Sequence, residues 1–169
     1  MAEFGAAFPA LEILGLNPEP LQLTTPKITL HSLLVVAQHF SNLLYLGIYL
    51  DAQETTTPKT HSSIKTGLFP NLLTLHVGVS PIASEISVAI FLSHLLLDNE
   101  RVEVWSRVSD SVVGHNATMV SERRKKWDQV ANTLPVLFQQ LKEEKAYRQD
   151  LEKEVEDLRM KNDVIMEKV

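Results

Sequence analysis

The sequence has 169 residues, of which 44% are hydrophobic, so it is long enough for one domain with its own core. The net charge is −5 and no segment is strongly basic, which argues against nucleic acid as a partner. The absence of cysteine excludes disulfides, thiol catalysis and cysteine zinc sites.

A heptapeptide that begins with phenylalanine occurs three times, at residues 8–14, 40–46 and 69–75. Each copy is followed by a further apolar residue, so the pattern L-x-x-L-x-[LIV] begins at Leu11, Leu43 and Leu72. This spacing is close to that of leucine-rich repeats. Alternation within each copy predicts a short strand with its core residues on one face. Val102-Glu103-Val104 is a weaker fourth unit.

Helices are expected between the strands, on the outer side of the stack. The first is predicted over Thr29–Phe40, with Thr29 as its cap, and the second over Ile82–Leu97, after the start signal Ser80-Pro81. The polar stretch Asp51–Gly67 predicts a surface loop in place of one helix. The phenylalanine of each copy should close the bottom of the stack.

The predicted fold is therefore α/β. It is a short open leucine-rich-repeat stack of three to four parallel strands with outer helices over residues 1–117, followed by a long kinked C-terminal helix. The alternative is an ordinary α/β domain whose three similar strands are a coincidence. Strand positions beside the core are expected to face an open concave surface, which makes them candidates for binding a protein. These candidates are Glu12, Tyr45, Tyr49, Thr74, His76 and Glu103.

Residues 118–169 form a charged tail in which acidic and basic residues are balanced. Thr118 or Ser121 is expected to cap its helix, and Pro135 should kink it near residues 131–134. Before the kink, Trp127 and Val130 are expected to pack on the repeat domain.

From about residue 148 the apolar positions of the tail narrow to a heptad seam, which indicates a coiled coil. Val155 and Asn162 occupy a positions, and an asparagine there favours two parallel strands. The alternative is a solvated single helix held by ion pairs within its own turns. The predicted seam consists of Leu151, Val155, Leu158, Asn162 and Ile165.

The residues that carry enzyme chemistry do not group in this sequence. The six histidines are scattered, and no glycine-rich loop or nucleophile elbow is present, so we expect no enzyme, cofactor or metal. The basic run Arg123–Lys126 is interpreted as a solvated helix face, with a nuclear signal or a phosphate patch as the alternative. No signal peptide is visible and residues 82–97 are too short and polar to span a bilayer, which predicts an intracellular protein, cytoplasmic or nuclear.

Several segments resemble the C-terminal repeats of F-box-like proteins from mushroom-forming fungi. The similarity covers about residues 5–145. The segments are Lys27–Leu34, Leu46–Ile48 through Asp51-Ala52, Leu75–Ile82, Val88–Ser93 and Trp127–Val130. The resemblance implies a repeat stack that holds the substrate of a ubiquitin ligase.

Two features depart from that family. No F-box helix of the L-P-x-E type precedes the repeats, so docking on a ligase adaptor is not implied, and the chain is either a truncated product or a repeat-only relative. Leu97-Asp98-Asn99 replaces the usual Phe-Pro at the start of the last repeat. The expected function is a non-catalytic protein-binding module, the substrate-recognition end of an F-box-type protein. The alternative is a structural homodimer formed through the tail.

Overall fold

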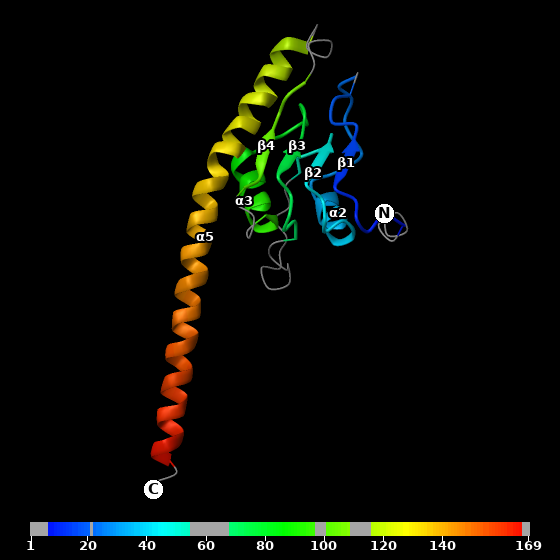
Figure 1. The fold of residues 1–169 in the computed structure, drawn as a ribbon. Coiled ribbons are helices and arrows are strands. Elements are labelled where there is room, and N and C mark those ends of the chain that lie inside the picture. Colours follow the sequence, from blue (N-terminus) through cyan, green and yellow to red (C-terminus); the bar gives the residue numbers. More distant parts are fainter. Residues whose placement is uncertain (1–6, 21, 55–67, 97–100, 109–115, 167–169) are drawn as a thin grey trace. The chain divides into compact units, whose positions relative to one another are not determined.

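The computed structural model describes residues 7–20, 22–54, 68–96, 101–108 and 116–166, with side chains as far as residue 161. The elements in chain order are β1 (Ile13–Leu16), α2 (Ser32–His39), β2 (Tyr45–Ile48), β3 (Thr74–His76), α3 (Glu85–Leu95), β4 (Glu103–Trp105) and α5 (Ala117–Met166) (Figure 1). The predicted α/β class, with four parallel strands and a long C-terminal helix, is confirmed. The chain divides into two compact units, Met1–Leu137 and Phe138–Val169.

The four strands form one parallel sheet in the order β1-β2-β3-β4. The register places Leu14, Leu46, Leu75 and Val104 side by side. These residues hold equivalent positions in the sequence repeat, so the strand predicted from each copy, including the weak fourth unit, is confirmed. Parallel neighbours need a crossover connection, and α2 and α3 are the helices of two such connections.

The repeated leucines form the core between the sheet and the helices. Leu46 and Leu75 are buried, as are Phe40 and Phe69 from the second and third copies. Phe8 of the first copy is 49% exposed, so the expectation that every phenylalanine closes the stack is wrong at this position. β1 is an edge strand, and an edge copy has a neighbour on one side only.

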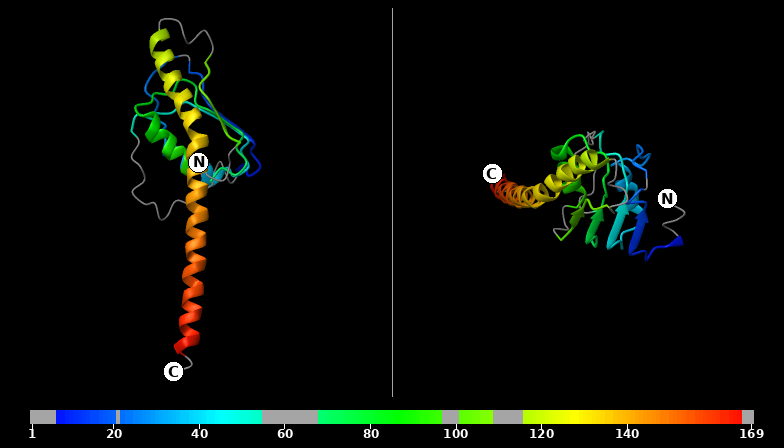
Figure 2. Two further views of the ribbon diagram at one scale, coloured as in Figure 1. Left: turned by 90° about the vertical axis from the view of Figure 1, so that its left-hand side faces the viewer. Right: turned by 90° about the horizontal axis from the view of Figure 1, so that it is seen from above.

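The helices α2 and α3 and the part of α5 that precedes residue 138 lie on the same side of the sheet (Figure 2). The predicted packing of Trp127 and Val130 on the repeat domain is confirmed, because both are buried and the Trp127 indole Nε1 donates to the Ser80 carbonyl at 2.9 Å. Trp127 and Val130 belong to the first compact unit, which ends at Leu137.

Three predicted helix starts are wrong. α2 begins at Ser32, and its N-cap residue, His31, makes no side-chain cap bond. α3 begins at Glu85, where the Ser84 hydroxyl accepts from the Ser87 N–H at 3.3 Å. α5 begins at Ala117, so Thr118 and Ser121 lie inside the helix.

Ser80, which was predicted to cap the second helix, has a different structural role. Its buried hydroxyl donates to the Val77 carbonyl at 2.6 Å and accepts from the Leu50 N–H at 2.9 Å. Leu50 follows β2 and Val77 follows β3, so this serine joins the ends of two neighbouring repeats. Tertiary hydrogen bonds outweigh the local start signal of Ser80-Pro81.

α5 is continuous through Pro135. The bend expected near residues 131–134 stays a prediction. The predicted loop Asp51–Gly67 lies outside the described residues from residue 55 onward, as does the start of the last repeat, Leu97-Asp98-Asn99. Within the ranges that the structure describes, no helix is long and apolar enough to cross a membrane.

Candidate functional site

One face of the sheet carries two rows of side chains that point away from the buried leucines. Successive strand residues point to opposite faces, so the neighbours of Leu46 in β2 belong to the opposite face. The strand register aligns the first row as Ile13, Tyr45, Thr74 and Glu103. It aligns the second row as Gly15, Gly47, His76 and Trp105. We call these eight positions the open sheet face.

The open sheet face is accessible along much of the first row. Ile13 is 68% exposed, Glu103 is exposed, and Tyr45 and Thr74 are half-buried. Trp105 at the other edge is 37% exposed. The helices α2 and α3 and the part of α5 before residue 138 lie on the opposite side of the sheet (Figure 2). The accessible part of the open sheet face is therefore the first row and the Trp105 edge, because Gly47 and His76 at the centre of the second row are buried.

A hydrogen-bonded chain runs through the centre of this face. The Tyr45 hydroxyl lies 2.9 Å from His76 Nδ1, and His76 Nε2 lies 2.9 Å from the Arg107 carbonyl oxygen. Because a carbonyl can only accept, Nε2 carries the hydrogen, and in the neutral imidazole Nδ1 accepts from the tyrosine hydroxyl. Burial, with a contribution from the negative charge of Glu19, raises the pKa of Tyr45 above its usual value of 10.0. The phenol is thus kept in its donor form.

The indole of Trp105 is held between two charged groups. Its Nε1 donates to Glu103 Oε2 at 3.0 Å, and the Arg107 guanidinium carbon lies 5.0 Å from the ring centroid. A guanidinium at this distance is attracted to the face of the ring. The aromatic side chain is therefore fixed at the edge of the sheet while part of it stays exposed.

The segment after β1 folds over the carboxyl end of the open sheet face. Asn17 has a positive φ of 51°, which turns the chain back, and Pro18 then lies against Gly47 and Gly78. A β-carbon at Gly47 would stand 3.0 Å from Pro18 Cγ and from the Tyr45 ring. At Gly78, where φ is +55°, it would overlap the Pro18 carbonyl oxygen at 2.0 Å. Both glycines are needed for this close approach.

Four of the six candidate protein-binding residues meet on the open sheet face: Tyr45, Thr74, His76 and Glu103. Glu12 does not align with them. It precedes β1, its carbonyl accepts from the Leu44 N–H, and Ile13 takes its expected place in the row.

Tyr49 is also misplaced by the sequence prediction. It is buried, its hydroxyl donates to the Thr24 carbonyl at 3.0 Å, and it accepts from Arg123 Nη1 at 3.4 Å. It follows the end of β2 and contacts α5, on the side away from the open sheet face.

Sequence reasoning missed Ile13, Trp105 and Arg107. The signal for Ile13 was present, because it holds the same heptapeptide position as Tyr45 and Thr74. Trp105 and Arg107 lie in the divergent last unit, where no repeat pattern singles them out.

The predicted tail seam lies on a helix whose apolar side chains are open to solvent. Leu151, Val155 and Leu158 are 41%, 47% and 58% exposed. The side chains of Asn162 and Ile165 lie outside the described residues. Ion pairs at i,i+3 and i,i+4 also form within this helix, between Arg148 and Glu144 and between Arg159 and Glu156.

Within the part of the chain that the structure describes, no group of three or more histidine or acidic side chains could hold a metal ion. Comparison with protein-family models, with curated proteins and with solved structures finds no match to this chain.

Proposed function

We propose that the chain is a non-catalytic protein-binding module, a short leucine-rich-repeat stack that holds its partner on the open sheet face. The observation that carries the proposal is that the first row of this face is accessible on four aligned strands. It offers an exposed isoleucine at one edge, a half-buried tyrosine at the centre and a partly exposed tryptophan at the other edge. Aromatic side chains and arginine are enriched among the residues that dominate the energy of protein interfaces.

Preorganisation of these side chains supports the same function. Tyr45 is fixed by His76, and Trp105 is fixed between Glu103 and Arg107. Binding normally costs conformational entropy for each side chain that a partner immobilises. Side chains that are already ordered reduce this cost, so a small surface can still bind with useful affinity.

The sequence resemblance supports a more specific role, the substrate-recognition end of an F-box-type protein in the cytoplasm or nucleus. The partner in that case is a protein substrate. The proposal concerns recognition of that substrate and does not extend to docking on a ligase adaptor.

Site-specific photo-cross-linking in an extract of the source organism tests the binding face. A photoreactive residue at Ile13 or Thr74 should capture one common partner. The matched control is Ile86 on α3, which is 63% exposed but lies on the helical side of the sheet. Ile13→Asp should then abolish capture from Thr74, whereas Ile86→Asp should leave it intact. Capture of that partner from Ile86 alone would place the binding surface on the helices and overturn the proposal.

The exposed seam of α5 supports a second function, homodimerisation through the tail. Leu151, Val155 and Leu158 follow the alternating spacing of four and three residues that two helices bury against each other. Single exposed apolar residues are common on protein surfaces, but a regular row of them on one helix face is typical of a helix that pairs.

A further inference from the structure

α5 divides the run of four basic residues at 123–126 into two pairs. Arg124 and Lys125 are exposed, whereas Arg123 and Lys126 are half-buried. Residues three apart share one face of a helix, so Arg123 and Lys126 both point at the segment that joins β3 to α3. The expected solvated face therefore describes only Arg124 and Lys125.

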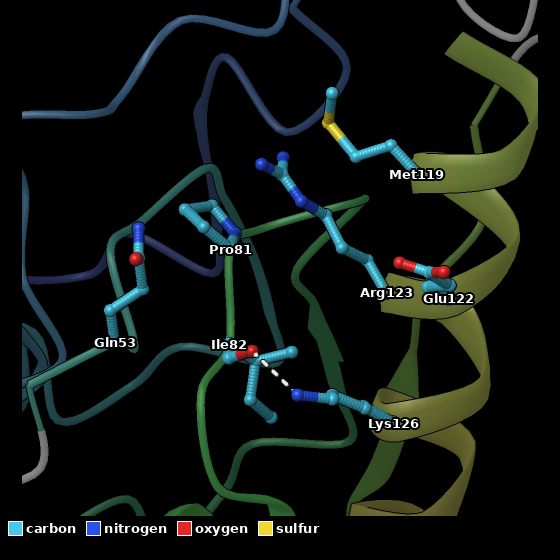
Figure 3. A pocket seen from close by; sticks show the side chains of 7 residues that line it. All are labelled: Gln53, Pro81, Ile82, Met119, Glu122, Arg123 and Lys126. Carbon is cyan, nitrogen blue, oxygen red and sulfur yellow. Dashed lines mark hydrogen bonds between the residues drawn. The ribbon is translucent and has the colours of Figure 1, made fainter.

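Arg123 and Lys126 are held by neutral oxygen atoms. Arg123 Nη1 donates to the Val79 carbonyl at 3.1 Å, and Lys126 Nζ donates to the Ala83 carbonyl at 2.9 Å. Lys126 Nζ also donates to the Ile82 carbonyl at 3.3 Å (Figure 3). Within the described residues, neither cation forms an ion pair with a carboxylate. Two positive charges are thus partly withdrawn from water without a counter-charge.

These two cations line a cavity of about 220 Å³, which we call the basic pocket. Its other lining residues are Gln53, Pro81, Ile82, Met119 and Glu122 (Figure 3). Glu122 brings one negative charge to the pocket, so the lining keeps a net positive charge. Pro81, Ile82 and Met119 supply an apolar wall.

Donor groups in the basic pocket remain available for a ligand. A guanidinium carries five N–H groups, and two of those on Arg123 are used by Val79 and Tyr49. An ammonium carries three, and two of those on Lys126 are used. The remaining donors of an arginine fork match the oxygens of a carboxylate or a phosphate.

We propose that the basic pocket binds a small oxyanion, a carboxylate or phosphate group, between Arg123 and Lys126. The volume lies below the range of about 300–1,000 Å³ that suits drug-sized ligands, so an anionic group with few further atoms is the class that fits. This site is separate from the open sheet face, because the part of α5 that precedes residue 138 lies on the opposite side of the sheet (Figure 2). Arg123 and Lys126 belong to that part of the helix. If the two cations only fasten α5 to residues 79–83, added anions should have no specific effect.

NMR titration of the intact chain tests the proposal, with inorganic phosphate in one arm and acetate in the other, at constant ionic strength. The side-chain N–H signals of Arg123 and Gln53 should shift and saturate, while the Nε–H signal of Arg124 in the same spectrum should not. The tighter of the two anions identifies the group that the pocket prefers. A lack of saturation with both anions, or equal shifts at Arg123 and Arg124, would overturn the site.

Three variants sharpen the result. Arg123→Gln should weaken binding by roughly tenfold or more, because a charge-assisted pair is lost. Glu122→Gln should tighten binding several-fold by removing the repelling charge, a gain that misfolding cannot imitate. Arg124→Gln, the matched control one residue along the helix, should leave binding unchanged. Weaker binding by Glu122→Gln, with the fold intact, would contradict the proposal.

Discussion

At the scale of single residues, the position of a leucine in the repeat decides its importance for the fold. Leu46 lies at the centre of β2 with no exposed surface, whereas Leu44 precedes β2 and is 36% exposed. An aspartate at position 46 would bury an unpaired carboxylate, which costs several kcal/mol. We therefore expect Leu46→Asp to unfold the compact unit Met1–Leu137. Leu44→Asp should lower the free energy of unfolding by at most about 1 kcal/mol. Urea unfolding of both variants measures this, and equal midpoints would contradict the assigned register.

The raised pKa of Tyr45 gives a second test at this scale. Because the pKa is raised, the folded chain keeps the phenol proton at pH values where the unfolded chain has lost it. The resulting stabilisation is complete below the usual value of 10.0 and is lost as the pH rises through the higher folded value. The difference in tyrosinate absorbance between the wild type and Tyr45→Phe should have its midpoint above 10.0.

Glu19 provides the internal check on that titration. Its negative charge is the smaller of the two causes of the raised pKa. Glu19→Gln should therefore lower the midpoint, but not to the usual value, because burial remains. A midpoint for Tyr45 at or below 10.0 would mean that the phenol is more solvated than its place beside Pro18 implies.

At the scale of elements, the strands were predictable and the helix ends were not. The strands follow from leucines that recur with the same alternation in each copy, and their register then places Leu14, Leu46 and Leu75 in one row. Ser80-Pro81 has the local form of a helix start, but Ser80 bonds to Leu50 and Val77 in neighbouring repeats. A sequence window cannot contain these distant partners.

The candidate site was predictable to the same extent. Tyr45, Thr74 and Glu103 follow from the repeat, and Ile13 would also have followed from a consistent alignment of the heptapeptides. The cation–π contact between Arg107 and Trp105 depends on the three-dimensional course of a unit that lacks the repeat pattern. The division of the basic run into an inner and an outer pair depends on how α5 is rotated against the sheet.

Helix capping distinguishes the observed ends from the predicted ones. The Ser84 hydroxyl accepts from the Ser87 N–H at the start of α3. Ser84→Ala should therefore destabilise the compact unit Met1–Leu137 by about 1 kcal/mol. Ser121, a predicted cap, is exposed and lies inside α5, so Ser121→Ala should change stability by less than about 0.5 kcal/mol. Thermal unfolding of the two variants compares them directly. A larger loss for Ser121→Ala would restore the predicted start of the last helix.

At the scale of the whole molecule, charge and apolar surface are distributed unequally along the chain. The net charge of −5 arises before the tail, which itself carries equal numbers of acidic and basic residues. Two tails can therefore approach without net repulsion, which would otherwise oppose association. In a parallel dimer, the heptad places Glu154 at a g position of one helix opposite Arg159 at an e position of the other, where the two charges attract. The ion pair that Arg159 forms with Glu156 in its own helix competes with this contact.

Sedimentation of the intact chain over a wide concentration range decides whether the tail pairs. Leu158 and Met160 are 58% and 53% exposed on the same helix, but only Leu158 belongs to the heptad seam. If the tail forms a parallel dimer, Leu158→Asp should give a monomer at all concentrations, because two carboxylates would have to enter a poorly solvated seam. Met160→Asp should dimerise like the wild type, since residue 160 faces away from the seam.

Asn162 then tests the register of that dimer. At an a position the two asparagines of a parallel pair meet each other, which fixes two strands at a cost in stability. Asn162→Ile should therefore raise the thermal stability of the associated chain and shift part of it towards trimers, and Asn162→Asp should weaken association. A solvated single helix leads to a different result, because the wild type and all four variants would then sediment as monomers. Each substitution would change the free energy of helix formation by no more than about half a kcal/mol. A concentration-independent monomer in the wild type would end the case for pairing through the tail, and the open sheet face would then be the surface proposed for a protein partner.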